Sequence, residues 1–174
     1  MIVIDTGVLY AAADSRDHDH DACAALLDAR PTAELIVPAP VVTESALLIR
    51  SRLGDRTEQA FVASVAAGDF TIEDLTEVDY QRRAELLAAY EDLHLGLVDA
   101  SVVAVSERLH ISTIGTTNHR GLQGGPPSPR RGVHPPAVTA GPKERVATTY
   151  GGAMRLELWA QLQARDHLRS LRKR

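Results

Sequence analysis

The chain has 174 residues, enough for one domain with a sizeable hydrophobic core, and 44% of its residues are hydrophobic. Its one cysteine, Cys23, excludes a disulfide framework and a cysteine-based zinc site. No apolar run reaches the roughly 18 residues that a membrane-spanning helix needs, and the start of the chain lacks the basic residues of a signal peptide. We therefore expect a soluble, cytoplasmic protein that does not bind membranes.

The net charge of −4 conceals two segments of opposite charge. Residues 1–120 contain 20 acidic residues, 9 arginines and no lysine, for a net charge of −11. Residues 121–174 contain 3 acidic and 10 basic residues, for a net charge of +7. A domain as acidic as the first segment repels nucleic acids unless metal ions or a basic partner compensate for the charge.

Short apolar strands alternate with helices through residues 1–120. The hydrophobic patterns predict strands at 1–4, 35–37, 70–72 and 111–114, and helices at 6–13, 17–28, 40–52, 56–66, 77–90 and 98–109. In the helix at 77–90 we expect an inward face made of Tyr80, Ala84, Leu87 and Ala88. The alternation indicates an α/β fold with a central, mostly parallel sheet of four strands flanked by helices.

The composition changes after Arg120. Of the 22 residues from 121 to 142, 11 are Gly or Pro, which is typical of a segment without packed structure. Residues 154–172 have apolar positions at helical spacing and could form a basic helix. We therefore divide the chain into a domain at residues 1–120 and a Gly/Pro-rich basic tail at residues 121–174, which we expect to be disordered apart from that helix.

Three acidic residues and one asparagine are candidates for a functional site. Asp5 directly follows the first predicted strand, Glu44 lies in the helix at 40–52, and Asp99 lies near the start of the helix at 98–109. Asn118 comes soon after the last strand, and the carboxyl ends of parallel strands share one edge of the sheet. Carboxylates at such an edge can hold Mg²⁺ and activate a water for attack on a phosphodiester.

Each acid also has an ordinary structural interpretation. Asp5 could cap the helix that follows it, Glu44 could be a surface acid, and Asp99 could interact with a helix dipole. Burying a carboxylate at the end of an apolar strand costs free energy unless the group is compensated or has a function, which favours a functional role for Asp5. The run of aspartates and histidines at 17–21 looks like a metal site, but its alternating residues point in different directions, so we interpret it as a solvated helix cap.

Four motifs follow one another along residues 1–120. They are Ile4-Asp5-Thr6 with Leu9, Val42-Thr43-Glu44, Leu97-Val98-Asp99-Ala100-Ser101, and Thr116-Thr117-Asn118-His119-Arg120. Together they resemble the signature of the PIN-domain family, and they are most similar to the VapC toxins of bacterial toxin–antitoxin pairs. One such motif alone would be weak evidence, but four in order at the family's spacing are specific.

The resemblance implies a PIN-like three-layer sandwich and an Mg²⁺-dependent endoribonuclease, with Mn²⁺ able to replace Mg²⁺. It implies that Asp5 and Asp99 hold the metal most directly, that Glu44 completes the site and orients water, and that Asn118 fills a fourth polar position. It further implies cleavage of structured RNA, a homodimer, and neutralisation by a VapB-type antitoxin.

The chain departs from the family's pattern after Asn118. Gly121-Leu122 stands where the family often has Asp-Phe, and the Gly/Pro run replaces the final strand. We hypothesise a frameshift: with a permitted set of synonymous codons, removing the first nucleotide of codon 121 turns GLQGGPPSPRRGVHPPA into DFRAVRPRHVEAFTLLP, which looks like a normal VapC C-terminus. Codons incompatible with this string would refute the hypothesis. If it holds, the domain loses its fifth strand and an acid at position 121, and metal affinity and stability fall.

Two other functions stay open at this point. Asp5-Thr6-Gly7 matches the catalytic triplet of aspartic proteases, but those proteins are almost wholly β, and the predicted helices oppose that interpretation. The chain could instead be a catalytically impaired toxin remnant that only binds the antitoxin. For a nuclease with so acidic a surface, we expect RNA binding to depend on Mg²⁺ and on arginines such as Arg16, Arg50 and Arg52.

Overall fold

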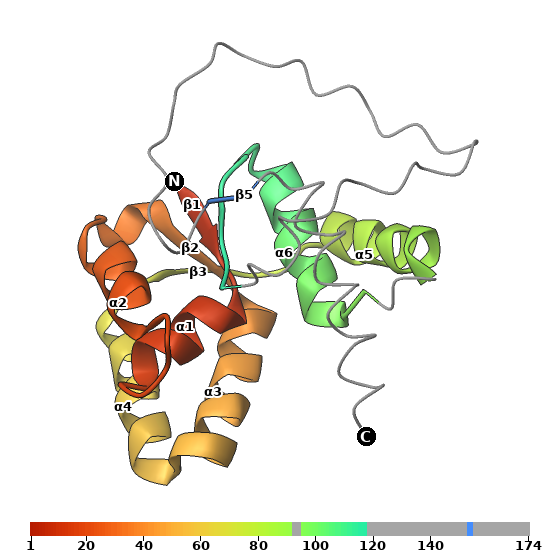
Figure 1. Cartoon of the computed structure of the whole chain (residues 1–174). Coiled ribbons are helices and arrows are strands. Elements are labelled where there is room, and N and C mark those ends of the chain that lie inside the picture. Colours follow the sequence, from red (N-terminus) through yellow and green to blue (C-terminus); the bar gives the residue numbers. More distant parts are fainter. Residues whose placement is uncertain (92–94, 118–152, 155–174) are drawn as a thin grey trace.

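The computed structural model describes residues 1–91, 95–117 and 153–154 (Figure 1). Its elements, in chain order, are β1 (Ile2–Ile4), α1 (Thr6–Ala13), α2 (His20–Asp28), the 3₁₀ turn η1 (Thr32–Glu34), β2 (Leu35–Pro38), α3 (Ala39–Leu53), α4 (Asp55–Ala67), β3 (Thr71–Glu73), α5 (Glu77–Ala89), α6 (Leu97–Arg108), β4 (Ile114–Gly115) and β5 (Ala153–Met154). The predicted alternation of strands and helices is thereby confirmed.

The strands form one sheet in the order β3-β2-β1-β4-β5. The first four strands are parallel, and β1 lies between β2 and β4, with Val3 opposite Ile36 on one side and Ile114 on the other. All residues of β1 and β2 are buried. A strand that is covered on both faces has consecutive apolar residues, whereas a strand with one solvent-facing side alternates apolar and polar residues. Residues 2–4 and 35–37 have the first pattern.

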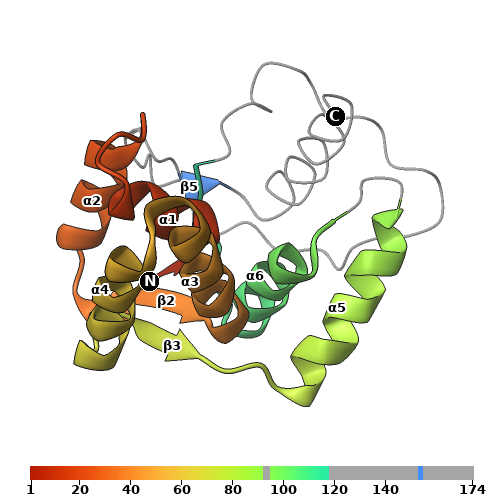
Figure 2. The same ribbon diagram turned by 90° about the horizontal axis from the view of Figure 1, so that it is seen from below.

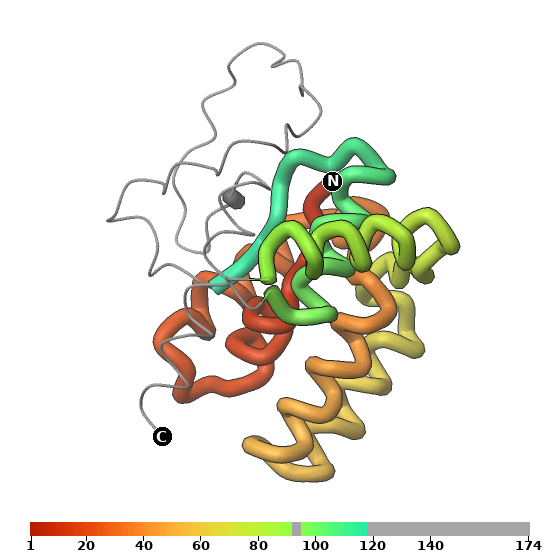
Figure 3. Tube along the Cα trace, turned by 90° about the vertical axis from the view of Figure 1, so that its right-hand side faces the viewer, coloured from red at the N-terminus to blue at the C-terminus, as the bar shows by residue number. Residues whose placement is uncertain are grey.

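The helices flank this sheet in two groups (Figures 1 and 2). Helices α1 to α4 pack together, while α5 packs on α6, and both α3 and α6 also contact the strands. Gly54, with φ of 89°, joins α3 to α4, and Gly68, with φ of 82°, ends α4; only glycine adopts this backbone region freely. Figure 3 shows the α3–α4 hairpin below α5 and α6 along the Cα trace.

Two element boundaries differ from the sequence-based prediction by more than one residue. Helix α2 begins at His20 rather than at residue 17, because the Asp17 carboxylate accepts a hydrogen bond from the backbone N–H of Asp19 at 2.9 Å and forms a turn there. Strand β4 begins at Ile114 rather than at residue 111. Residues 110 and 111 form the end of α6 instead of a strand. His110 has φ of 54°, and the N–H of Ile111 donates to the Ser106 carbonyl.

A fifth strand was not predicted. The two residues of β5 pair antiparallel to β4 and occupy the sheet edge, with Met154 opposite Ile114 and Ala153 opposite Gly115. The predicted parallel sheet of four strands is present, and β5 adds a two-residue antiparallel strand from the C-terminal segment at its edge. The segment directly after residue 121, where the family's closing strand would lie, is outside the described residues. Met154, which was predicted to begin a helix, belongs to this strand; the rest of the predicted helix lies outside the described residues.

The buried face of α5 was predicted wrongly. Tyr80, Ala84 and Ala88 are exposed, and Leu87 is only partly buried, whereas Asp79, Arg83 and Leu86 are buried. A capping box sets the start of this helix, because Thr76 and Asp79 exchange hydrogen bonds between side chain and backbone. Asp79 then faces inward and meets Arg108 of α6, so a charged pair replaces the apolar contact that the sequence pattern suggested.

Arg108 joins the end of α6 to the segment that leads into α5. Its Nε donates to both carboxylate oxygens of Asp79, at 3.0 and 2.9 Å, and its Nη2 donates to Glu73 at 2.9 Å and to the Asp74 carbonyl at 3.3 Å. Burial raises the pKa of Asp79, but hydrogen bonds from Arg108 and Thr76 outweigh burial, and the pKa is lowered overall. Asp79 is therefore ionised in the folded protein at neutral pH.

Among the described helices, none is both long and apolar enough to cross a membrane.

Candidate active site

Asp5 lies at the carboxyl end of the central strand. Its N–H donates to the Gly115 carbonyl at 3.0 Å, which continues the pairing of β1 with β4 by one residue. Its side chain is 4% exposed. The Oδ1 atom accepts a hydrogen bond from the Thr6 N–H at 2.7 Å, and Oδ2 accepts one from the Thr116 hydroxyl at 3.0 Å. The backbone of α1 and the end of β4 together fix the direction of this carboxylate.

Glu44 reaches the same region from α3. It lies in the first half of that helix and is exposed, unlike Asp5. Its Oε2 accepts a hydrogen bond from the Thr6 hydroxyl at 2.5 Å. Thr6 therefore contacts two of the predicted site acids, one through its backbone and one through its side chain.

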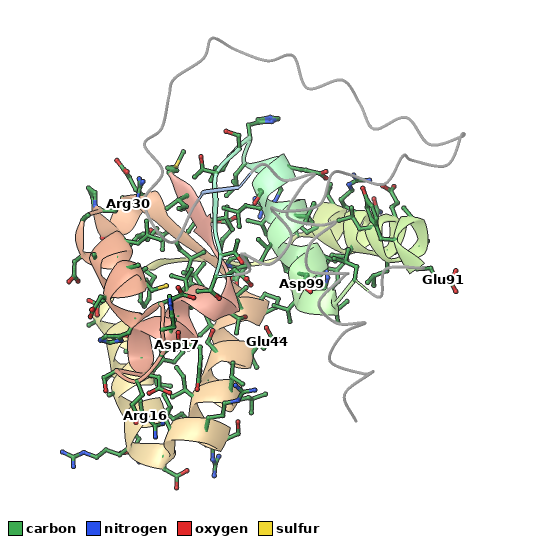
Figure 4. The ribbon with its side chains drawn as sticks, in the orientation of Figure 1. Arg16, Asp17, Arg30, Glu44, Glu91 and Asp99 are labelled. Carbon is green, nitrogen blue, oxygen red and sulfur yellow. The ribbon has the colours of Figure 1, made fainter. Side chains whose placement is uncertain are left out.

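Asp99 is the third residue of α6. Its Oδ2 accepts a hydrogen bond from the N–H of Gly96, the residue before the helix, at 3.3 Å. A Cβ at position 96 would lie 2.7 Å from that oxygen, so glycine leaves room for the carboxylate at the start of the helix. Figure 4 shows Asp99 on α6 and Glu44 on the neighbouring part of α3.

Electrostatics connect the three acids. The pKa of Asp99 is raised to about 7, first by burial and then by the negative charges of Asp5 and Glu44; the hydrogen bond from Gly96 only partly offsets these effects. A carboxylate is repelled in this way only by neighbours close enough to act through a medium of low dielectric constant. Asp99 is therefore near enough to Asp5 and Glu44 for their charges to act on it, and these are the three acids that the sequence singled out.

This donor set fits a hard divalent cation. Within the described residues, no group of three or more His, Cys, Asp or Glu side chains is placed so that it could hold a metal ion by itself. Mg²⁺ does not require a complete set of protein ligands, since it usually binds one or two carboxylates together with waters and substrate phosphates. A cation there would also relieve the repulsion that raises the pKa of Asp99.

One predicted site residue cannot be placed, and one contributor was missed. Asn118 lies outside the described residues. Thr116 was quoted only as part of a motif, although its hydroxyl binds Asp5. The available signal was its position directly after β4, since β4 and β1 are neighbours and residues at their ends meet.

The other residues considered for function lie away from the acids or on the surface. His18 is exposed beside Asp19, and Nδ1 of His20 lies 3.0 Å from the Ala11 carbonyl oxygen. Arg16 pairs with Asp14, and Figure 4 draws it well away from Glu44 and Asp99. Arg50 pairs with Asp55 and Glu58, and Arg52 lies over the Tyr10 ring at 5.5 Å. That these arginines bind RNA stays a prediction.

The pKa of Asp99 predicts how stability depends on pH without metal. Because the folded pKa of about 7 exceeds the ordinary value of 3.8 for an aspartate, the folded state binds more protons between these values, and the free energy of unfolding falls as pH rises from about 4 to 7. Urea denaturation in EDTA at pH 5.0 and 7.5 measures this fall. The same experiment on Asp99→Asn should show a flatter profile, and stability rising from pH 5.0 to 7.5 in the unaltered chain would contradict the expectation.

Comparisons with known proteins show the family and the fold of the chain. The sequence model described as the PIN domain matches residues 2–123. The chain is 29% identical over 119 residues to ribonuclease VapC26 of Mycobacterium tuberculosis (strain ATCC 25618 / H37Rv), and the match covers 68% of this chain and 87% of that protein. It also superimposes on the crystal structure of M. tuberculosis VapC20, a sarcin-ricin loop cleaving toxin, with a TM-score of 0.61 over 66% of this chain and 87% of the other. At 23% identity, this last likeness shows the shared fold.

Proposed function

Because the chain belongs to the PIN domain family, we propose that it is an endoribonuclease toxin of the VapC type that depends on Mg²⁺ and cleaves phosphodiester bonds of structured RNA. The observation that carries this proposal is that Thr6 hydrogen-bonds both Asp5 and Glu44 at the end of the central strand, while the charges of these two acids act on Asp99. The similarity to a ribonuclease over 119 residues of the chain supports it. The α/β architecture also excludes the aspartic-protease alternative, since those enzymes are almost wholly β.

The residues have separate roles in this proposal. Asp5 and Asp99 would hold the cation, and Glu44, which is exposed, would complete the site and orient a water toward the phosphodiester. When bound there, Mg²⁺ supplies a Lewis acid beside the scissile phosphate, with Mn²⁺ as a substitute. Asn118 would add a fourth polar group. Thr116 would keep the Asp5 carboxylate turned toward the site.

We further propose a homodimer and a VapB-type antitoxin as partners.

The net negative charge of residues 1–120 supports a requirement for cations during RNA binding, because the same charge repels phosphates. Arg16, Arg50 and Arg52 remain our candidates for RNA contacts.

A second candidate function has one observation in its favour. The family match ends at residue 123, close to Gly121-Leu122, where the sequence departs from the family's pattern. This supports the frameshift hypothesis and, with it, a toxin remnant that binds the antitoxin with little or no cleavage of RNA.

Cleavage assays separate these two functions. Total cellular RNA is incubated with the purified chain and with its frame-restored version, each in Mg²⁺ or EDTA. We expect the restored protein to cut RNA in Mg²⁺ only, and the activity of the given chain to show how far residues 121–174 impair it. If the given chain is inactive but forms a stable complex with antitoxin, the remnant interpretation holds. If neither protein cuts RNA, the nuclease proposal fails.

A further inference from the structure

Thr6 is the residue that connects two of the three acids. Its N–H donates to Oδ1 of Asp5 at 2.7 Å, and its hydroxyl donates to Oε2 of Glu44 at 2.5 Å. Thr6 itself is 8% exposed and lies at the first position of α1, directly after the central strand. Its own position is therefore fixed by the core rather than by the site.

Glu44 needs such a contact more than the other acids do. Asp5 accepts bonds on both oxygens from the fixed groups of Thr6 and Thr116, and Asp99 is held by the N–H of Gly96. Glu44 is exposed, and an exposed glutamate on a helix can turn freely among several side-chain conformations. The bond from the Thr6 hydroxyl opposes this freedom, and a hydrogen bond to a charged carboxylate is stronger than one between neutral groups.

The direction set by this bond matters because of the charges nearby. The negative charges of Glu44 and Asp5 both raise the pKa of Asp99, so Glu44 is held against repulsion. Without a donor, the side chain would turn toward solvent, where its charge is better hydrated. Resting on the proposed function, we infer that Thr6 is a positioning residue: its hydroxyl fixes the Glu44 carboxylate toward Asp5 and Asp99 and thereby sets the rate of RNA cleavage.

The test compares Thr6→Val, which keeps the shape and removes the hydroxyl, with Thr6→Ser, which keeps the hydroxyl. Thr57→Val is the matched control, because Thr57 is a partly buried threonine of α4 whose hydroxyl donates only to the Leu53 carbonyl. We expect Thr6→Val to lower kcat about tenfold to a hundredfold with little change in KM, and Thr6→Ser to stay within about threefold of the unaltered chain. Thr57→Val should leave kcat unchanged.

Two readouts distinguish positioning from a general structural effect. In the Glu44→Gln background, Thr6→Val should change kcat by less than about twofold, because the group through which Thr6 acts is already altered. In metal-free protein, the carbon resonance of the Glu44 carboxylate should move in Thr6→Val and return in Thr6→Ser.

An unchanged Glu44 resonance in Thr6→Val, or an equal loss of kcat in both backgrounds, would overturn the inference. Failure of the proposed function is recognised separately, as absence of cleavage by the unaltered and frame-restored chains. The resonance of Glu44 is measured without metal or RNA, so it decides on the positioning role in that case as well.

Discussion

Asp99→Asn should abolish most RNA cleavage and at the same time stabilise the metal-free protein. Removing a charged group that acts at the reacting centre costs on the order of a thousandfold in kcat. Asparagine keeps the size of the side chain and an oxygen that can accept the bond from the Gly96 N–H. It removes the charge that burial, Asp5 and Glu44 all oppose, so the free energy of unfolding in EDTA at pH 7.5 should rise by a few kcal/mol, since each pKa unit corresponds to ~1.4 kcal/mol.

The two effects are measured on the same preparation, by RNA cleavage in Mg²⁺ and by urea denaturation in EDTA. Asp69→Asn is the control, because Asp69 is an exposed carboxylate after α4 and takes no part in the site. It should change neither property. Asp99→Asn with unaltered cleavage would remove Asp99 from the site, and Asp99→Asn that is less stable than the unaltered chain at pH 7.5 would contradict the proposed repulsion among the acids.

Arg108→Met should cause the largest loss of stability that we expect from a side chain outside the site. The methionine removes the guanidinium from Asp79, which is 1% exposed and keeps only its hydrogen bonds with Thr76. Leaving one partner of a buried ion pair uncompensated costs about 3 kcal/mol or more. Urea denaturation at pH 7 measures this cost.

Arg82→Met provides a matched control on the same pair of helices. Arg82 bridges Glu85 and Glu107 with bonds as short as those of Arg108, but those two acids are 65% and 40% exposed. Exposed pairs contribute about 1 kcal/mol or less because water screens and hydrates the charges. Equal losses for the two variants would show that burial of Asp79 does not set the strength of the Arg108 pair.

Much of the fold followed from local sequence patterns. Strands β1 and β2 were predicted to within a residue because they are buried on both faces and read as uninterrupted apolar runs. The face of α5 could not be predicted in the same way. Its buried positions include Asp79 and Arg83, whose charged side chains a hydrophobic pattern assigns to the surface. The partner that allows Asp79 to be buried is Arg108, which lies 29 residues away in α6.

The site was predictable in part. Asp5 carried its own signal, because an acid that ends a buried strand needs a compensating role. Glu44 and Asp99 had no such signal; each resembled an ordinary helical acid until the order of the four motifs was considered. The contacts of Thr6 and Thr116 with these acids were not predicted, since a hydroxyl becomes informative only when the fold shows what it faces.

The position of β4 beside β1 has a consequence for synthesis of the chain on the ribosome. The bond from the Thr116 hydroxyl to Asp5 joins residues 111 positions apart, and the pairing of Val3 with Ile114 is as distant. Such pairings form late, because the intervening chain must be ordered before they contribute. A nascent chain therefore cannot assemble the three acids until α6 and β4 have been translated, so the activity we propose would arise only once nearly the whole PIN domain has left the ribosome.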